Sequence, residues 1–225
     1  MDHRSALLYA RLNSYKALVA KTEGFIRWSL ARMQNPYVAC SFGKDSSVML
    51  HLILKQKPDI PVVFASHPET RILDNYEKVI QYWLKHGINY HEVFCEGGLI
   101  KVKHDQRNRM AAWSDQWDAF FVGIRSQESF GRRISLKKYG MFHRLTSGKI
   151  KVSPLADWKT EDIAAYTAFH NLPLLSKYQF EGISARTTSG IPRTHINECL
   201  QSLKNRDIQA FNNLCRLFPD VNEFL

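Results

Sequence analysis

The chain has 225 residues, 44% of them hydrophobic, and its 31 Lys and Arg against 21 Asp and Glu give a formal net charge of +10. This length supports one sizeable core, and no apolar run approaches the roughly 18 residues that a membrane-spanning helix needs. Charges scattered through the N-terminus exclude a signal-peptide core, and four cysteines without a C-x-x-C pair or zinc spacing indicate neither disulfides nor a metal cluster. We therefore expect a cytoplasmic protein with reduced thiols and no membrane contact.

The N-terminal stretch from residue 5 to residue 33 places apolar residues at helical spacing among charged ones. This pattern predicts one or two amphipathic helices ahead of the first strand. Such an extension could pack on the core or make the contact of a homodimer. The apolar positions are Leu7, Leu8, Leu12, Leu18, Phe25, Ile26 and Leu30.

The middle of the chain alternates between strand and helix patterns. An alternation of this kind predicts an α/β fold of the Rossmann-like type, an open and mainly parallel sheet with helices on both faces. Ligands of such sheets bind beyond the carboxyl ends of the strands. The pattern places strands at 37–42, 61–65, 90–94 and 119–123, and helices at 46–56 and 71–86.

The stretch VACSFGKDSSVMLHL, residues 38 to 52, joins the first strand to a helix and is rich in phosphate-binding residue types. Free amides at a helix N-terminus attract a phosphate, Gly43 allows close approach, and Lys44 adds a positive charge. The spacing differs from the Walker A loop, which disfavours a P-loop NTPase. The alternative is an ordinary helix with an Asp or Ser N-cap. The remaining candidates are Asp45 and the hydroxyls of Ser41, Ser46 and Ser47.

A second motif, GIRSQESFGRR at residues 123 to 133, supplies planar guanidinium groups suited to phosphate or sulfate oxygens. These are Arg125, Arg132 and Arg133. Glu128 could order this cluster or bind magnesium, although a plain surface ion pair would look the same in the sequence. We expect this motif and the loop around Gly43 to converge on one crevice.

The positive charge is concentrated in residues 101 to 151, which hold 12 basic and 4 acidic side chains and so carry +8. This indicates an anionic partner: a polyphosphate nucleotide, and beyond it DNA, RNA or an acidic protein. A solvated basic face without a partner is the alternative. Trp113 and Trp117 could stack on bases, but their helical spacing favours core packing.

The segment S-x-G-K-D-S resembles the pyrophosphate loop, or PP-loop, of the adenine nucleotide alpha hydrolases, as found in the phosphoadenylylsulfate (PAPS) reductase family. GIRSQESFGRR is similar to that family's G-[IL]-R-x-x-[QE]-S-x-x-R segment, and PLADWKTEDIAAY at residues 154 to 166 to its P-L-x-D-W-x-x-x-D-[IV] segment. The three motifs occur in the family's order over about residues 35 to 190. The resemblance implies ATP or a sulfonucleotide as ligand, with magnesium.

Carried onto this sequence, the resemblance implies a set of site residues. Lys44, Asp45 and Arg125 would be catalytic, with Asp45 also the magnesium ligand. Phosphate binding would involve Ser41, Phe42, Gly43, Ser46, Ser47, Gly123, Glu128, Arg132 and Arg133. The loop FASHPETR, residues 64 to 71, would border adenine through the backbone of Phe64, Ala65 and Ser66 and ribose through His67 or Glu69. The alternative is that this loop is only a Pro-containing helix entry. Asp157 and Arg186 would be supporting residues.

The reaction depends on the cysteines. The resembled reductases attack the bound nucleotide with a thiolate in an E-C-G-x-H motif on the C-terminal tail, whereas this sequence ends in PDVNEFL, and Glu198-Cys199-Leu200 lacks the Gly and His. Cys199 and Cys215 fall on apolar helical stripes that predict core packing. Many relatives have R-T-G-C-x-x-C where this sequence reads RTTSG at residues 186 to 190, a stretch without a cysteine, so no iron-sulfur cluster is expected.

We therefore favour an ATP pyrophosphatase, which cleaves ATP at the α-phosphate and could activate a nucleic-acid backbone for sulfur insertion, as in DNA phosphorothioation. The alternatives are a PAPS or sulfonucleotide reductase, the small subunit of ATP sulfurylase with its GTPase partner, and a nucleotide-binding regulatory subunit without turnover. A sulfur-donor protein would be a further partner. The expected organisation is one domain, with an N-terminal extension at 1–35, a nucleotide-binding core at 36–190 and C-terminal helices at 191–225.

Overall fold

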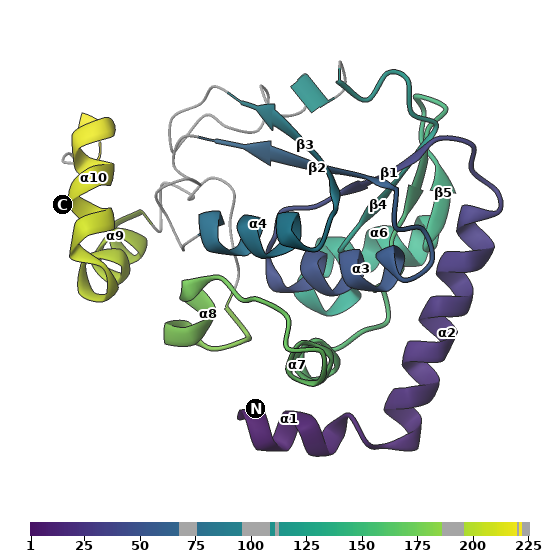
Figure 1. The fold of residues 1–225 in the computed structure, drawn as a ribbon, viewed down its shortest axis with the longest axis horizontal. Helices are drawn as coiled ribbons and strands as arrows, with labels where there is room; N and C mark the ends of the chain where they lie inside the picture. The colour runs from purple at the N-terminus through teal and green to yellow at the C-terminus, as the bar shows by residue number, and fades with distance from the viewer. Residues whose placement is uncertain (68–75, 96–108, 111–112, 186–195, 220, 222–225) are drawn as a thin grey trace.

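A six-stranded sheet with the strand order β3-β2-β1-β4-β6-β5 forms the centre of the molecule (Figure 1). The computed structural model describes residues 1–67, 76–95, 109–110, 113–185, 196–219 and 221. Five of the strands run parallel to one another, and β5 alone runs in the opposite direction, pairing with β6. The strands are β1 (Pro36–Ala39), β2 (Pro61–Ser66), β3 (Asn89–Phe94), β4 (Ala119–Val122), β5 (Phe142–Arg144) and β6 (Ile150–Val152).

One face of the sheet carries the main hydrophobic core. Val38 of β1 lies in register with Val62 of β2 and Phe121 of β4, and all three side chains are fully buried. Val48 and Leu52 of the covering helix α3 (Lys44–Leu54) are buried to the same extent. This cluster also includes side chains of α2 (Asn13–Leu30), α4 (Tyr76–Lys85) and α7 (Thr160–Phe169).

The opposite face packs on aromatic side chains. Tyr37 of β1 contacts Trp113 and Trp117, whose stacked rings have centroids 5.5 Å apart. Both tryptophans therefore pack on the sheet, the use that their helical spacing favoured. At the β5 edge of this face, Tyr139 of α6 (Phe130–Tyr139) stacks on His143 of β5. The expected arrangement, a mainly parallel sheet with helices, is confirmed.

Helices at both ends of the chain complete the fold. At the N-terminus, α1 (His3–Tyr9) lies against α7, where the Tyr9 hydroxyl donates to Asp162 over 3.0 Å. After α8 (Ser176–Glu181), α9 (Ile196–Arg206) and α10 (Ile208–Leu217) form a pair with its own small core (Figure 1). Among the helices described, none is long and apolar enough to cross a membrane.

Candidate active site

The loop between β1 and α3 places its backbone beyond the carboxyl end of the central strand. Gly43 is the N-cap residue of α3 and has no side chain to cap the helix, although the Lys44 amide donates to the Tyr178 hydroxyl over 3.4 Å. The Asp or Ser N-cap that offered an alternative interpretation is therefore not present. The positive end of the α3 dipole is open to an anion.

Phe42 has a left-handed backbone with a φ of 53°, which is rare for a residue with a bulky side chain. Such a conformation costs about 1–2 kcal/mol relative to the right-handed region. The Phe42 ring is fully buried and lies edge-on to Phe64, with centroids 5.3 Å apart. Core packing thus holds the loop in shape, and only the backbone of Phe42 is in a position to contact a ligand.

The hydroxyl groups of the loop differ in how they are used. Ser46 Oγ donates to the Gly43 carbonyl over 3.0 Å and lies 3.1 Å from Ser41 Oγ. Ser47 Oγ is buried and has no partner among the described residues. A buried hydroxyl without a partner is uncommon in proteins, so a bound ligand atom would satisfy it.

Asp45 joins the two motifs that sequence reasoning placed in one crevice. Arg125 Nε donates to Asp45 Oδ1 over 2.7 Å, and Lys44 Nζ lies 3.3 Å from Asp45 Oδ2. The Arg125 and Lys44 side chains are only 3% and 5% exposed. Two buried cations therefore share one carboxylate at the N-terminus of α3.

The end of β4 approaches the start of α3 so closely that only glycine fits. A Cβ atom at Gly123 would lie 2.9 Å from the backbone nitrogen of Ser46 and 3.0 Å from its Cα. Since these are backbone atoms, they could not move aside without shifting the helix. Gly123 therefore sets the distance between the PP-loop and the arginine motif.

Lys44 makes contacts that the sequence did not suggest. Its Nζ donates to the Ala185 carbonyl over 2.8 Å and lies 4.9 Å from the centroid of the Tyr178 ring. Burial lowers the pKa of the Lys44 ammonium, and the nearby Asp45 carboxylate opposes this shift. Neither Tyr178 nor Ala185 belongs to a recognisable motif, and only the fold brings them to the loop.

Within the arginine motif, Glu128 contacts both Arg125 and Arg132. The Arg125 amide donates to Glu128 Oε2 over 2.8 Å, and Glu128 also forms an ion pair with Arg132. These contacts involve the short helix η2 (Ser126–Glu128). Arg125 Nη1 donates to Gln127 over 3.1 Å, whereas Arg132 and Arg133 remain largely exposed. Arg125 is thus fixed in place, and the two later arginines are accessible.

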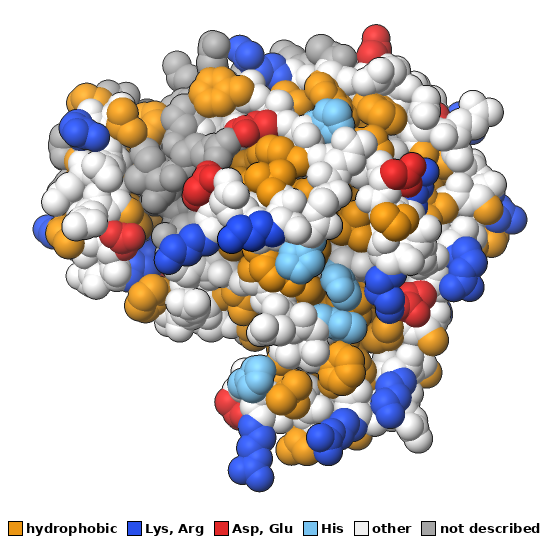
Figure 2. All heavy atoms as spheres, viewed as in Figure 1, with side chains coloured by type: hydrophobic (Ala, Val, Ile, Leu, Met, Phe, Trp, Pro, Cys, Tyr) orange, Lys and Arg blue, Asp and Glu red, His pale blue; other side chains and the backbone are white. Residues whose placement is uncertain are grey.

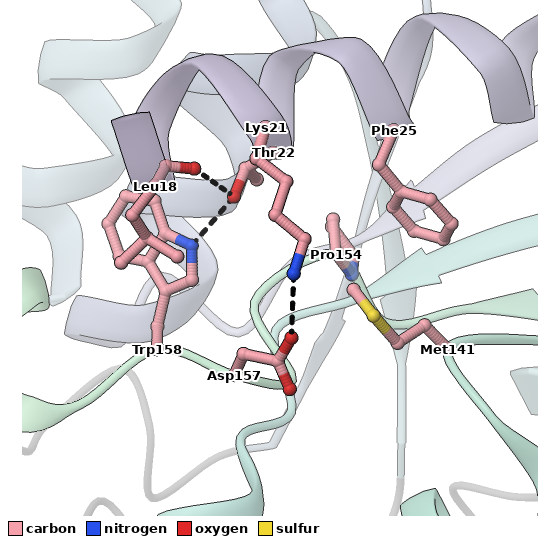
Figure 3. Close-up of a pocket in the computed structure, with 8 residues that line it drawn as sticks. All are labelled: Leu18, Lys21, Thr22, Phe25, Met141, Pro154, Asp157 and Trp158. Atoms are coloured by element: carbon pink, nitrogen blue, oxygen red, sulfur yellow. Dashed lines mark hydrogen bonds and ion pairs between the residues drawn. The ribbon is translucent and has the colours of Figure 1, made fainter. Parts of the chain in front are cut away.

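Asp157, a predicted supporting residue, lies exposed and away from the Asp45 cluster. Its carboxylate lies 3.4 Å from Lys21 Nζ of α2, beside a pocket of about 50 Å³ whose lining includes no PP-loop residue (Figure 3). The indole of Trp158 donates to Thr22 over 2.9 Å, while its carbonyl accepts from Arg125 Nη1 over 3.4 Å. The segment therefore ties α2 to the arginine motif.

The predicted adenine loop is described only at its start. Phe64 and Ser66 are buried at the end of β2, so the Phe64 side chain belongs to the core and only its backbone could read a base. Ser66 Oγ has no partner among the described residues, and His67 is also buried. Ala65 pairs with Val93 of β3. The candidates Glu69 and Arg186 lie outside the described residues.

The Asp45 carboxylate does not fit a magnesium site. Magnesium requires oxygen ligands, but both oxygens of Asp45 already contact a cationic nitrogen, so a divalent ion there would face two positive charges. Within the described ranges, no group of three or more His, Cys, Asp and Glu residues could hold a metal ion. Magnesium binding at Asp45 stays a prediction that this geometry disfavours.

All four cysteines are free thiols in shielded surroundings. Cys40 and Cys95 are fully or nearly fully buried, and burial raises the pKa of Cys40 to about 12. Cys199 and Cys215 are half-buried, and burial also raises the pKa of Cys199. Since a reactive cysteine needs a lowered pKa and access, neither Cys40 nor Cys199 has the surroundings of a nucleophile.

Comparisons with known proteins agree on the family and the fold. The phosphoadenosine phosphosulfate reductase domain model matches residues 35–71 and 99–183. The phosphoadenosine 5'-phosphosulfate reductase of Xanthomonas euvesicatoria pv. vesicatoria (strain 85-10) is 30% identical over 190 residues, which cover 70% of this chain and 74% of that relative.

Two solved structures share the fold at low identity. Candida glabrata FMN adenylyltransferase superposes with a TM-score of 0.60 at 15% identity, over 79% of this chain and 66% of that chain, so this chain spans slightly less than two thirds of its length. The PAPS reductase of Candida auris, in a phosphate complex, gives a TM-score of 0.52 at 17% identity, over 72% and 85% of the two chains. Both likenesses support the adenine nucleotide alpha hydrolase fold.

Proposed function

The chain belongs to the phosphoadenosine phosphosulfate reductase domain family, whose members are enzymes, and from this premise we propose that it cleaves ATP between the α- and β-phosphates. The products would be pyrophosphate and either AMP or an AMP adduct. The observation that carries this proposal is the arrangement of Lys44, Asp45 and Arg125 at the N-terminus of α3, where Gly43 is the N-cap residue.

In this scheme the N-terminal amides of α3 bind the phosphates of the nucleotide. An oxygen of water or of an acceptor attacks the α-phosphorus, the bond from that phosphorus to the bridging oxygen breaks, and pyrophosphate leaves with the electron pair. An attacking water gives up its proton to solvent, whereas the anionic oxygen of a backbone phosphate has no proton to lose. Negative charge develops on the leaving group, and the Lys44 ammonium stabilises it after exchanging the Ala185 carbonyl for a phosphate oxygen.

Asp45 and Arg125 have positioning roles in the proposal. Asp45 holds Lys44 at the loop, and Arg125 holds Asp45 through a hydrogen bond. Two further hydrogen bonds, to the Gln127 side chain and to the Trp158 carbonyl, fix the position of Arg125. The finer part of the proposal concerns the acceptor, which we take to be a phosphate of a nucleic-acid backbone. The concentration of positive charge in residues 101 to 151 supports it.

The names of the relatives favour a second candidate, reduction of a sulfonucleotide. That reaction needs a thiolate that attacks the sulfur of the bound nucleotide. The raised pKa of Cys199 and the burial of Cys40 speak against a ready nucleophile. A folded Cys199→Ala variant that binds the nucleotide but has lost all activity would favour this second candidate over the first.

The deciding experiment incubates the purified protein with ATP and, separately, with PAPS and a thiol reductant. AMP with pyrophosphate is the expected result from ATP, because the proposed cleavage is at the α-phosphate. Formation of ADP and orthophosphate would contradict the proposal. Release of sulfite from PAPS without any cleavage of ATP would identify a reductase instead.

A further inference from the structure

Residues 130–152, which form α6 and the β5–β6 hairpin, contain seven basic residues and no Asp or Glu. We call these 23 residues, all of them described, the basic surface. They hold seven of the 12 basic side chains in the segment 101–151 and none of its four acidic ones. The seven residues are Arg132, Arg133, Lys137, Lys138, Arg144, Lys149 and Lys151.

The protein itself neutralises little of this charge. Arg132 forms an ion pair with Glu128, but within the described residues none of the other six has a carboxylate partner. Arg144 and Lys149 donate instead to the carbonyls of Gly148 and Ser114. Burial and the positive charge of Arg132 lower the pKa of Lys151. Cations gathered without carboxylates repel one another, and a bound anion would relieve this repulsion.

The helix of this surface is largely exposed. None of the residues of α6 is buried, and Phe130, Ile134 and Tyr139 are 69%, 47% and 51% exposed. The Arg133 guanidinium lies 5.6 Å from the Phe130 ring centroid, and Lys138 Nζ lies 5.0 Å from that of Tyr139. Exposed aromatic rings beside cations are the combination that single-stranded nucleic acids bind, through stacking and phosphate contacts.

The basic surface also begins next to the PP-loop. Asp45 bonds to Arg125, the Arg125 amide bonds to Glu128, and Glu128 pairs with Arg132 of α6. Three consecutive contacts thus connect the phosphate-binding loop to the first turn of the helix. A polyanion on α6 would pass close to a nucleotide bound at Lys44.

We propose that the basic surface binds the phosphate backbone of a nucleic acid and holds it beside the PP-loop. This inference rests on the proposed function, because the bound backbone would be the acceptor of that reaction. An anionic membrane fits less well, because only three large exposed hydrophobic side chains lie on α6, those of Phe130, Ile134 and Tyr139. The charge also extends onto the hairpin rather than lying along one helix. DNA and RNA share the chemistry that these cations recognise.

The test measures binding of fluorescently labelled single-stranded DNA, duplex DNA and RNA by anisotropy at several salt concentrations. Lys137→Glu/Lys138→Glu reverses two exposed charges that have no part in the proposed catalysis. Lys78→Glu/Lys85→Glu, on exposed positions of α4, is the matched control with the same change in net charge. We expect the first variant to weaken binding at least about tenfold and to reduce the salt slope by about 1.4–1.8, the value for two lost phosphate contacts.

Equal weakening in both double variants would overturn the proposal, because it would reflect net charge alone. The proposal would also be overturned if none of the three nucleic acids bound at low salt. Binding of poly-L-glutamate as tight as that of nucleic acid, or tighter binding of phosphatidylserine vesicles, would overturn it as well. Pyrophosphate release from ATP without nucleic acid, measured in the same variants, should remain unchanged. If the wild-type protein releases no pyrophosphate, but the α6 variant loses nucleic-acid binding and the α4 variant does not, the basic surface is supported and the proposed function is contradicted.

Discussion

Lys44 and Asp45 are neighbours in one ion-pair network, but their different contacts predict different responses to substitution. In Lys44→Met, the Asp45 carboxylate keeps Arg125 as its partner, and a buried ammonium is removed. We expect ATP cleavage to fall at least tenfold, which corresponds to about 1.4 kcal/mol of transition-state stabilisation. The thermal midpoint should change little, because removing a partly desolvated charge also removes its burial cost.

Asp45→Asn serves as the contrasting variant. It leaves Lys44 and Arg125 buried without a carboxylate, an arrangement that costs about 3–5 kcal/mol in comparable cases. We therefore expect it to lose both activity and stability, as measured by pyrophosphate release and by urea unfolding. Equal destabilisation by Lys44→Met and Asp45→Asn would mean that Lys44 acts in folding rather than in catalysis.

Sequence motifs identified the residues of this network but not their partners. The PP-loop and the arginine motif could be found because each is a short local pattern, and strand–helix alternation implied that they meet. Nothing in the sequence pairs Asp45 with Arg125, places the Ala185 carbonyl on Lys44, or assigns a left-handed backbone to Phe42. Such contacts depend on tertiary packing between segments far apart in the chain.

At the scale of elements, the short distance between the end of β4 and the start of α3 can be tested by substitution of Gly123. Gly123→Ala would place a Cβ atom 2.9 Å from the Ser46 nitrogen and force the helix away from the strand. We expect about 1–3 kcal/mol of destabilisation, as for other overpacked sites, with a clear loss of ATP cleavage. Urea unfolding and pyrophosphate release measure the two effects.

Gly131→Ala is the matched control for this substitution. Gly131 lies in α6, and its added Cβ atom would meet nothing within 4 Å. Alanine in an open helix position should stabilise the protein by about 0.5–1 kcal/mol. A Gly123→Ala variant as stable and as active as Gly131→Ala would show that the strand–helix distance does not matter.

The contact between α3 and α7 should make stability depend on pH. His51 Nδ1 lies 2.9 Å from the Tyr166 hydroxyl, and its ring centroid is 4.7 Å from that of His170; Figure 2 shows histidine side chains gathered on this face. Burial, followed by the charges of His170, Lys55 and His86, lowers the pKa of His51 to about 4, against a small opposing effect of Glu23.

Because the folded-state pKa lies below the unfolded value of 6.5, the unfolded chain binds more protons between these two values. The stabilisation is therefore complete above pH 6.5 and is lost as the pH falls toward about 4. For a half-buried group we expect a change on the order of 1–2 kcal/mol after solvent screening. In thermal unfolding from pH 7 to pH 4, His51→Gln should flatten the profile, whereas the exposed His3→Gln should not. Parallel profiles for His51→Gln and the wild type would contradict this assignment.

The elements with the clearest periodic apolar patterns were the ones that the sequence predicted. The four parallel strands β1 to β4 and helix α3 follow clear apolar patterns and lie within a few residues of the predicted positions. The predicted helix at 46–56 begins earlier, at Lys44, because Gly43 serves as its N-cap. Strands β5 and β6 were not predicted, since three-residue segments with a basic residue in each show no periodicity.

On the scale of the whole molecule, the core is divided into unequal parts. The cluster between α9 and α10 contains six buried residues, whereas the main core joins the sheet to the helices on one of its faces. Glu181 of α8 connects the α9–α10 pair to the rest, because it accepts from Ser202 over 3.1 Å and from Arg206 over 3.2 Å. Because the α9–α10 pair buries little apolar surface, we expect it to unfold locally at a lower free energy than the sheet.

This division can be measured by hydrogen exchange at increasing denaturant concentration. Amides of α9 and α10 should exchange at lower denaturant than those of β1 and β4. Leu203→Ala, at a position 3% exposed, should weaken the pair by about 2–5 kcal/mol, accelerate exchange there and leave the sheet unchanged. Leu52→Ala, in the main core, should instead accelerate exchange in the sheet.

The same variant also tests how far the active site depends on the C-terminal helices. Lys44 contacts Tyr178 and Ala185, both of which precede α9 in the chain, and Glu181 of α8 is the link to α9. We expect Leu203→Ala to keep ATP cleavage within about threefold of the wild type, since less than about 1 kcal/mol of barrier would then be at stake. A larger loss, with β1 still protected from exchange, would show that opening of α9 and α10 is transmitted through α8 to Lys44. Exchange that rises together in β1 and in α9 and α10 would instead show that the molecule unfolds as one unit.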